Sequence, residues 1–166
     1  PNGIPIVVDN ADPSLDQDPG LPTAATDGYD VIIDAGNAGN PGGNIFARIE
    51  STTGNVVDTL VSVGTDAPVS PVGDIGDFNI AGSLLGSTIT SFGGSVGNIS
   101  VGLDLAALDE DGPGPIVSAT RILAIRGAIG NVSAGDDIGE NFAPGVAGQP
   151  TVGPVQVVAD REIGNI

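Results

Sequence analysis

A short pattern of hydrophobic and polar positions recurs along the second half of the chain. The pattern runs aliphatic, Gly, Asn or Asp, aliphatic, small polar, and then aliphatic or Ala. Its four copies begin at Ile75, Val96, Ile129 and Ile163, so they are 21, 33 and 34 residues apart. Alternating apolar positions of this kind are typical of short strands with one buried face. Their regular return predicts a repeat architecture.

The two longer intervals each contain a segment rich in Gly and Pro, over residues 109–115 and 144–150. Such segments mark loops, and insertions in repeat proteins leave the repeat at a loop. Without these insertions the repeating unit is 21 to 22 residues long. A weaker copy is expected from Thr53, which precedes Ile75 by 22 residues, and a further weak form is Gly43-Asn44-Ile45.

Each unit is expected to contain three short strands. One is the recurring phrase, and the others follow it (residues 102–105 and 135–139) or precede it (residues 89–92, 122–125 and 155–158). The Gly, Asn and Asp residues between strands are expected to supply corners with positive φ. Four aliphatic residues of the phrases should be buried: Ile99, Val101, Ile129 and Val132.

A chain that turns three times and then repeats its phrase predicts an all-β fold, a parallel β-helix or β-solenoid. Like positions then stack between coils, and the recurring Asn should form a ladder. The alternative is an antiparallel β-sandwich, jelly-roll-like, whose hairpin turns use Gly-Asn. Residues 103–110 are the one candidate for a helix.

The first 70 residues read differently. Three strands are expected there, over residues 4–8, 29–34 and 44–50. Pro5 has no backbone N–H, which favours an edge position for the first of them. We expect residues 1–70 to form an N-terminal strand and cap region, and residues 71–166 to form the β-solenoid repeats of the same structural unit.

Phrases of the form Gly-x-Ile-Gly-Asn-Val/Ile, such as residues 127–132, carry a resemblance. They are similar to those of Gly/Asp-rich secreted bacterial β-solenoid (parallel β-helix) surface proteins, both adhesin-like and surface-layer-like. The resemblance covers about residues 73–166. It implies a structural protein displayed at the cell surface.

The composition narrows the function further. The chain has no Cys, His or Met, and its 21 acidic residues against four basic ones give a formal net charge of -17. Thiolate and imidazole chemistry is therefore excluded, and nucleic acids or anionic membranes would be repelled. A start at Pro1 without Met fits a processed product or a segment of a longer chain, such as one that has lost a secretory signal. We expect an extracellular protein that is not an enzyme.

Clusters of Asp are candidate sites for a hard cation. Asp16 and Asp18 precede Gly20, and Asp109 and Asp111 precede Gly112. Calcium takes six to eight oxygen ligands, and Asp-x-Asp followed by Gly begins many calcium loops. The sequence thus predicts calcium as the cofactor of these pairs. Solvated acidic turns are the alternative.

The expected function is an extracellular structural subunit that self-assembles into a filament, surface layer or adhesin by head-to-tail strand addition. The partner is then another copy, through a polymerisation interface that comprises Ile4, Ile6, Val8, Ile163 and Ile166. The alternative is a carbohydrate-binding or polysaccharide-cleaving β-helix, with a cell-surface polysaccharide as partner. Its acid, base and anion-binding groups would come from Asp136, Asp137 and Arg126, or from Asp160 and Arg161.

Overall fold

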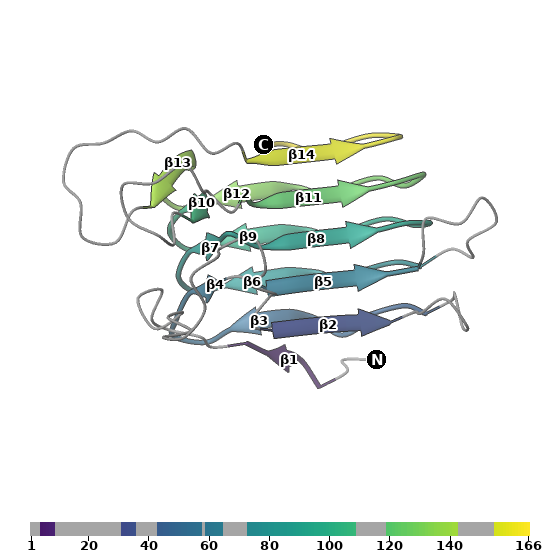
Figure 1. Cartoon of the computed structure of the whole chain (residues 1–166), viewed down its shortest axis with the longest axis horizontal. Coiled ribbons are helices and arrows are strands. Elements are labelled where there is room, and N and C mark those ends of the chain that lie inside the picture. Colours follow the sequence, from purple (N-terminus) through teal and green to yellow (C-terminus); the bar gives the residue numbers. More distant parts are fainter. Residues whose placement is uncertain are drawn as a thin grey trace, which may run out of the picture.

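The structure is a computed structural model that describes residues 4–8, 31–35, 43–57, 59–64, 73–108, 119–142 and 155–166. The described part of the chain is all-β and contains no helix (Figure 1). The candidate helix over residues 103–110 is not formed in its described part, residues 103–108, because strand β10 (Leu105–Leu108) lies there. Its Leu105 pairs with Leu84 on one side and with Ile138 on the other, which requires an extended backbone.

The strands form three parallel sheets. The first sheet has the order β1 (Ile6–Val7), β3 (Ile49–Ser51), β6 (Phe78–Ile80), β9 (Ile99–Val101), β12 (Val132–Ala134). The second has the order β4 (Val56–Val57), β7 (Leu84–Leu85), β10, β13 (Ile138–Phe142). The third has the order β2 (Val31–Ala35), β5 (Thr59–Val63), β8 (Thr88–Ser91), β11 (Arg121–Ala124), β14 (Gln156–Ala159).

The chain visits the first, second and third sheets in turn and then returns to the first. We call one such turn a coil, so that β3 to β5, β6 to β8, β9 to β11 and β12 to β14 are four successive coils. Figure 1 shows them stacked one above the other, with β1 at one end and β14 at the other. Strands of the same sheet are therefore separated in sequence by a whole coil.

All strand pairs in the described residues are parallel, so the antiparallel sandwich is wrong for this part of the chain. Asp74 and Ser95, which hydrogen-bond across two coils, are 21 residues apart, as the shortest repeat interval predicts. The next two coils have spacings of 33 and 34 residues. The extra length falls between β10 and β11 and between β13 and β14, so both insertions leave the stack at the same corner.

The weaker copy expected from Thr53 is wrong. Ile75 pairs with Ile45, not with a residue near Thr53, so the other weak form, Gly43-Asn44-Ile45, occupies the corresponding place. Val56 instead begins β4 and pairs with Leu84 in the second sheet. Residues 43–64 thus contribute strands to the same three sheets as the later repeats, and the expected boundary near residue 70 stays a prediction.

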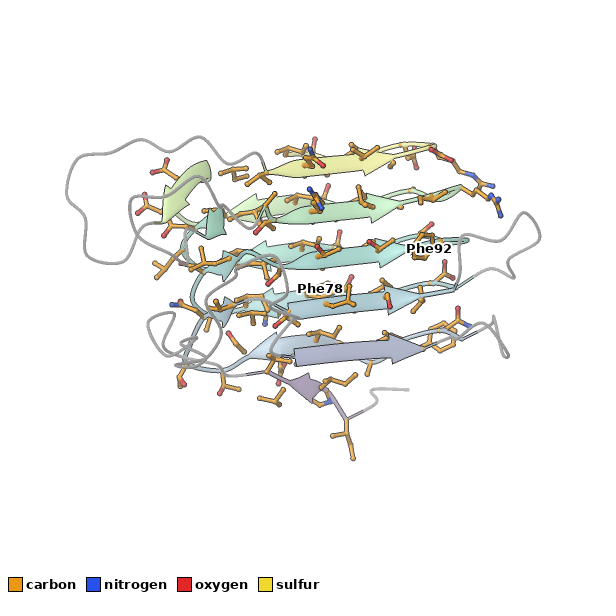
Figure 2. The ribbon with its side chains drawn as sticks, viewed as in Figure 1. Phe78 and Phe92 are labelled. Carbon is orange, nitrogen blue, oxygen red and sulfur yellow. The ribbon has the colours of Figure 1, made fainter. Side chains whose placement is uncertain are left out.

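The core is built from columns, by which we mean the inward side chains at the same position of successive coils (Figure 2). One column of the first sheet consists of Ile49, Phe78, Ile99 and Val132, all buried. The four side chains expected to be buried, Ile99, Val101, Ile129 and Val132, are confirmed to be so. Since no strand with a described burial pattern buries more than three residues, core stability depends on stacking between coils.

Glycines at the corners have two roles, because Gly64 and Gly86 have the positive φ that was expected, whereas three others do not. Gly73, Gly94 and Gly127 do not have a positive φ, although the neighbouring non-Gly residue Arg126 does, at 69°. An added Cβ would lie 2.7 Å from the Gly43 oxygen at Gly73 and 2.5 Å from the Gly73 oxygen at Gly94, and at Gly127 it would overlap the Gly94 oxygen. These glycines let adjacent coils approach each other, rather than adopt a left-handed turn.

Candidate functional site

The four carboxylates expected to bind calcium, Asp16, Asp18, Asp109 and Asp111, lie outside the described residues. Within the described ranges no three acidic side chains come together in a way that could hold a metal ion. The calcium sites therefore stay a prediction.

Calcium should raise the melting temperature of the chain by about 2 to 4 °C for each kcal/mol of binding free energy. The reason is that a divalent ion between two carboxylates relieves the self-repulsion of a strongly acidic chain. Circular dichroism melts with calcium and with chelator measure the effect. Asp109→Asn together with Asp111→Asn should reduce it, whereas Glu162→Gln, at an exposed carboxylate outside the Asp clusters, should not. Superimposable melts with calcium and chelator would contradict the prediction.

The residues considered for catalysis lie at two different corners of the stack, so the structure does not bring Asp136 and Asp137 together with Arg126. The backbone N–H of Arg126 donates to the Asp160 carboxylate, Oδ2, at 2.9 Å. The backbone N–H of Arg161 donates to the carbonyl oxygen of Gly127 at 3.1 Å. Asp160 thus closes the strained turn of the coil beneath it, which is a structural contact. Asp136 and Asp137 lie exposed between β12 and β13.

Three of the four Arg side chains, Arg121, Arg126 and Arg161, are exposed and form no ion pair with a described residue. Arg48 is different, because its Nη2 lies 2.5 Å from Oε2 of Glu50. All three unpaired guanidinium groups belong to the last two described coils. They are the main source of positive charge on an otherwise acidic molecule.

The expected asparagine ladder is present at the corner before the first sheet. The Asp77 oxygen Oδ1 accepts from the backbone N–H of Asn98 at 2.8 Å and from its Nδ2 at 3.2 Å. Oδ1 of Asn98 accepts from the Asn131 N–H at 3.0 Å, and Oδ1 of Asn131 from the Asn165 N–H at 3.0 Å. Each side chain therefore satisfies a backbone donor of the next coil, which sets the register of the stack.

Replacing Asn98 by Ala should lower the free energy of unfolding by about 1 kcal/mol. The substitution removes the acceptor of the Asn131 N–H and the partner of the Asp77 carboxylate. Asn98→Asp keeps an acceptor oxygen and should be milder. Asn79→Ala, an exposed position of the adjacent strand, is the matched control. Equal urea midpoints for Asn98→Ala and Asn79→Ala would contradict a stabilising ladder.

A second polar column was not predicted from the sequence. Thr59, Ser87 and Thr120 are buried at the corner between the second and third sheets. The Ser87 hydroxyl accepts from the Thr59 N–H at 3.1 Å and donates to the Leu85 carbonyl at 2.8 Å. Thr120 accepts from the Ser87 N–H at 3.3 Å and donates to the Ala106 carbonyl. Their sequence spacing of 28 and 33 residues includes an insertion, which hides the column in a sequence scan.

The residues expected at a polymerisation interface lie at the two ends of the stack. The N–H groups of Ile6 and Val8 donate to the carbonyl oxygens of Arg48 and Glu50, both at 2.9 Å. Both residues are therefore hydrogen-bonded to the neighbouring coil. The first strand therefore pairs with β3 as an edge strand of the first sheet. The edge position predicted from Pro5 is confirmed. Ile4 is exposed on the same side.

At the opposite end, Ile163 pairs with Ile129 and is half-buried, whereas the Ile166 side chain is 68% exposed. Whether these residues form an interface stays a prediction. We call residues 163–166 the terminal segment, because it continues the first sheet beyond β12. The N–H of Val132 donates to the Asn165 carbonyl at 2.8 Å, which continues the register of the lower coils.

Within the described residues, the apolar core is less well covered at the two ends of the stack than in its middle. In the second sheet Leu105 is 0% exposed, but Ile138 in the next coil of the same column is 41% exposed. In the third sheet Val61, Ile89 and Ile122 are buried, and the end members of their column, Ile33 and Val157, are only partly buried. Side chains that are interior elsewhere in the stack therefore meet solvent at its ends.

Comparison of the chain with protein-family models, with curated proteins and with solved structures gave no match. In the part of the chain that the structure describes, no helix is long and apolar enough to cross a membrane.

Proposed function

We propose that the chain is an extracellular structural subunit, a parallel β-helix that self-assembles end to end into a filament, surface layer or adhesin. The observation that carries the proposal is the partial exposure of column residues at both ends of the described stack, such as Ile138, which is 41% exposed, and Ile33 and Val157, which are partly buried. An uncovered strand edge with an apolar face favours pairing with a further strand. Contacts between different ends of identical subunits are heterologous and generate open fibres unless the rotation closes them.

The composition supports a structural role outside the cell. The chain has no Cys or Met to be oxidised and no His, and its Gly-rich phrases resemble those of secreted β-solenoid surface proteins. Its ladders and glycine columns serve the stacking of coils, which is a structural function. The high negative charge keeps such a subunit soluble until it assembles.

Light scattering and electron microscopy of the 166-residue chain over a range of concentrations test the proposal. Particle mass should rise with concentration, and fibres or sheets should be visible at the highest concentrations. Assembly should increase with ionic strength, because salt screens the repulsion between subunits of charge -17. A chain that stays monomeric at every concentration and ionic strength would defeat the proposal.

A further inference from the structure

The outer face of the first sheet lies between two corners of the stack. We call the part of the chain that crosses this face in one coil a row, so that residues 92–103 form the β9 row and residues 125–136 form the β12 row. Each row begins at the corner that follows the third sheet and ends at the corner that precedes the second sheet. Both rows have a described coil on either side in the stack.

The middle of both rows is polar and has small side chains. Asn98 and Asn131 of the asparagine ladder are exposed there, and so are Ser100 and Ser133. The larger outward side chains of the two rows stand at the corners. A second sheet could therefore approach this face to about 10 Å, the usual spacing of packed sheets, and would meet the corner side chains on both flanks.

The two corners of the β12 row carry opposite charges. Arg126 stands at the first corner and Asp136 at the second; both are exposed, and neither forms an ion pair with a described residue. Arg126 also has a φ of 69°, which is unfavourable for a residue with a Cβ. An exposed Arg that is held in a strained conformation, with its guanidinium unpaired in the described part of its own chain, favours a contact with another molecule.

The two corners of the β9 row are apolar. Phe92 is half-buried at the end of β8 (Figure 2), and Leu103 at the other corner is 50% exposed. The strand register places Gly93 next to Arg126 in the stack and Leu103 next to Asp136. Each corner therefore combines an apolar site in the β9 row with a charged site in the β12 row.

We propose that a second copy of this chain binds the outer face of the first sheet in a two-fold contact whose axis runs along the asparagine ladder. Asn131 is five residues from both Arg126 and Asp136, and Asn98 is five residues from both Gly93 and Leu103. The two-fold rotation then sets Arg126 of each copy opposite Asp136 of the other, so that the dimer has two such pairs. It also sets Leu103 of each copy opposite Gly93 and beside Phe92 of the other.

Charge selects this axis. A two-fold axis in the same face but perpendicular to the stack would set each corner opposite its own copy, with Arg126 facing Arg126 and Asp136 facing Asp136. The axis along the ladder avoids these like-charge pairs and leaves the coils of both copies stacked in the same direction. The contact joins two stacks side by side, so it goes beyond the end-to-end assembly proposed above and does not depend on it.

Charge reversal at the two corners tests the contact. Arg126→Asp and Asp136→Arg each turn both pairs of the dimer into like-charge pairs, and the variant with both substitutions restores opposite charges. Asp adopts a left-handed backbone more readily than most residues, so Arg126→Asp should keep the fold. Arg121→Asp is the matched control, because Arg121 is an exposed, unpaired Arg that begins β11 in the third sheet. Circular dichroism melts check that all four variants remain folded.

Sedimentation velocity on the 166-residue chain measures the dimer. Arg126→Asp and Asp136→Arg should each weaken dimerisation about tenfold, because two charge pairs change sign at once. The doubly substituted chain and Arg121→Asp should dimerise as the unsubstituted chain does. An equimolar mixture of the two single variants should also dimerise, since one copy then has two acidic corners and the other two basic ones.

The outcomes separate this inference from the proposed function. If the chain assembles and the single variants assemble equally well, the side-by-side contact is wrong while self-assembly stands. Failure of both the doubly substituted chain and the mixture to recover the dimer would overturn the pairing of Arg126 with Asp136. An unsubstituted chain that forms dimers and nothing larger would support this contact and overturn end-to-end assembly, and a chain that never associates would overturn both.

Discussion

Replacing Ile129 by Asp should abolish the cooperative folding of the chain. Ile129 is 1% exposed and sits in the column between Val96 and Ile163, so its side chain has aliphatic neighbours above and below. An uncompensated charge at such a site costs about 3 to 5 kcal/mol. Total stabilities of small proteins are about 5 to 15 kcal/mol, so a loss of this size leaves little or no folded population. Far-UV circular dichroism and urea denaturation measure the effect.

Ser133→Asp is the control for this prediction. Ser133 lies in β12 of the same coil, and its side chain is exposed on the outer face. The same charge there should change the free energy of unfolding by no more than about 0.5 kcal/mol. If the two variants unfolded at the same urea concentration, the inward and outward faces of the first sheet would be assigned incorrectly.

Gly127→Ala should destabilise the chain by about 3 kcal/mol, the upper part of the range for overpacking. The added Cβ would overlap the Gly94 carbonyl, which is backbone and cannot move aside without separating two coils. The addition of a single methyl group at an exposed turn rarely lowers the free energy of unfolding by so much. The midpoint of urea denaturation should therefore fall strongly, with no change in the secondary structure of the fraction that remains folded.

Gly139→Ala distinguishes close approach from backbone conformation. Gly139 has a φ of 98°, but an added Cβ there would have no atom within 4 Å. Its cost should be that of the left-handed backbone alone, about 1 to 2 kcal/mol. A larger loss for Gly139→Ala than for Gly127→Ala would contradict close approach of the coils as the reason for glycine at position 127.

The strands of the third sheet were predicted accurately from the local pattern of apolar residues. Residues 89–92, 122–125 and 155–158 were expected as strands, and β8, β11 and β14 each begin within one residue of these bounds. The second sheet was predicted less well. Its strands were expected over residues 102–105 and 135–139 but lie at Leu105–Leu108 and Ile138–Phe142. Both strands start three residues later than expected. Their apolar segments are too short to show a clear periodicity, so the sequence does not define where they begin.

The sequence by itself determined the all-β class, the three strands per repeat, the burial of Ile99 and Ile129 and the asparagine ladder. These follow from side chains whose spacing is periodic within one unit. The tertiary structure alone decided that β1 pairs with β3, that Ile45 rather than Thr53 begins an earlier coil, and that Thr59, Ser87 and Thr120 share a column. Each of these depends on which residues stack across insertions of variable length. It also decided why the corner glycines are needed, because the distance between two coils is set by their packing and leaves no signal within either coil.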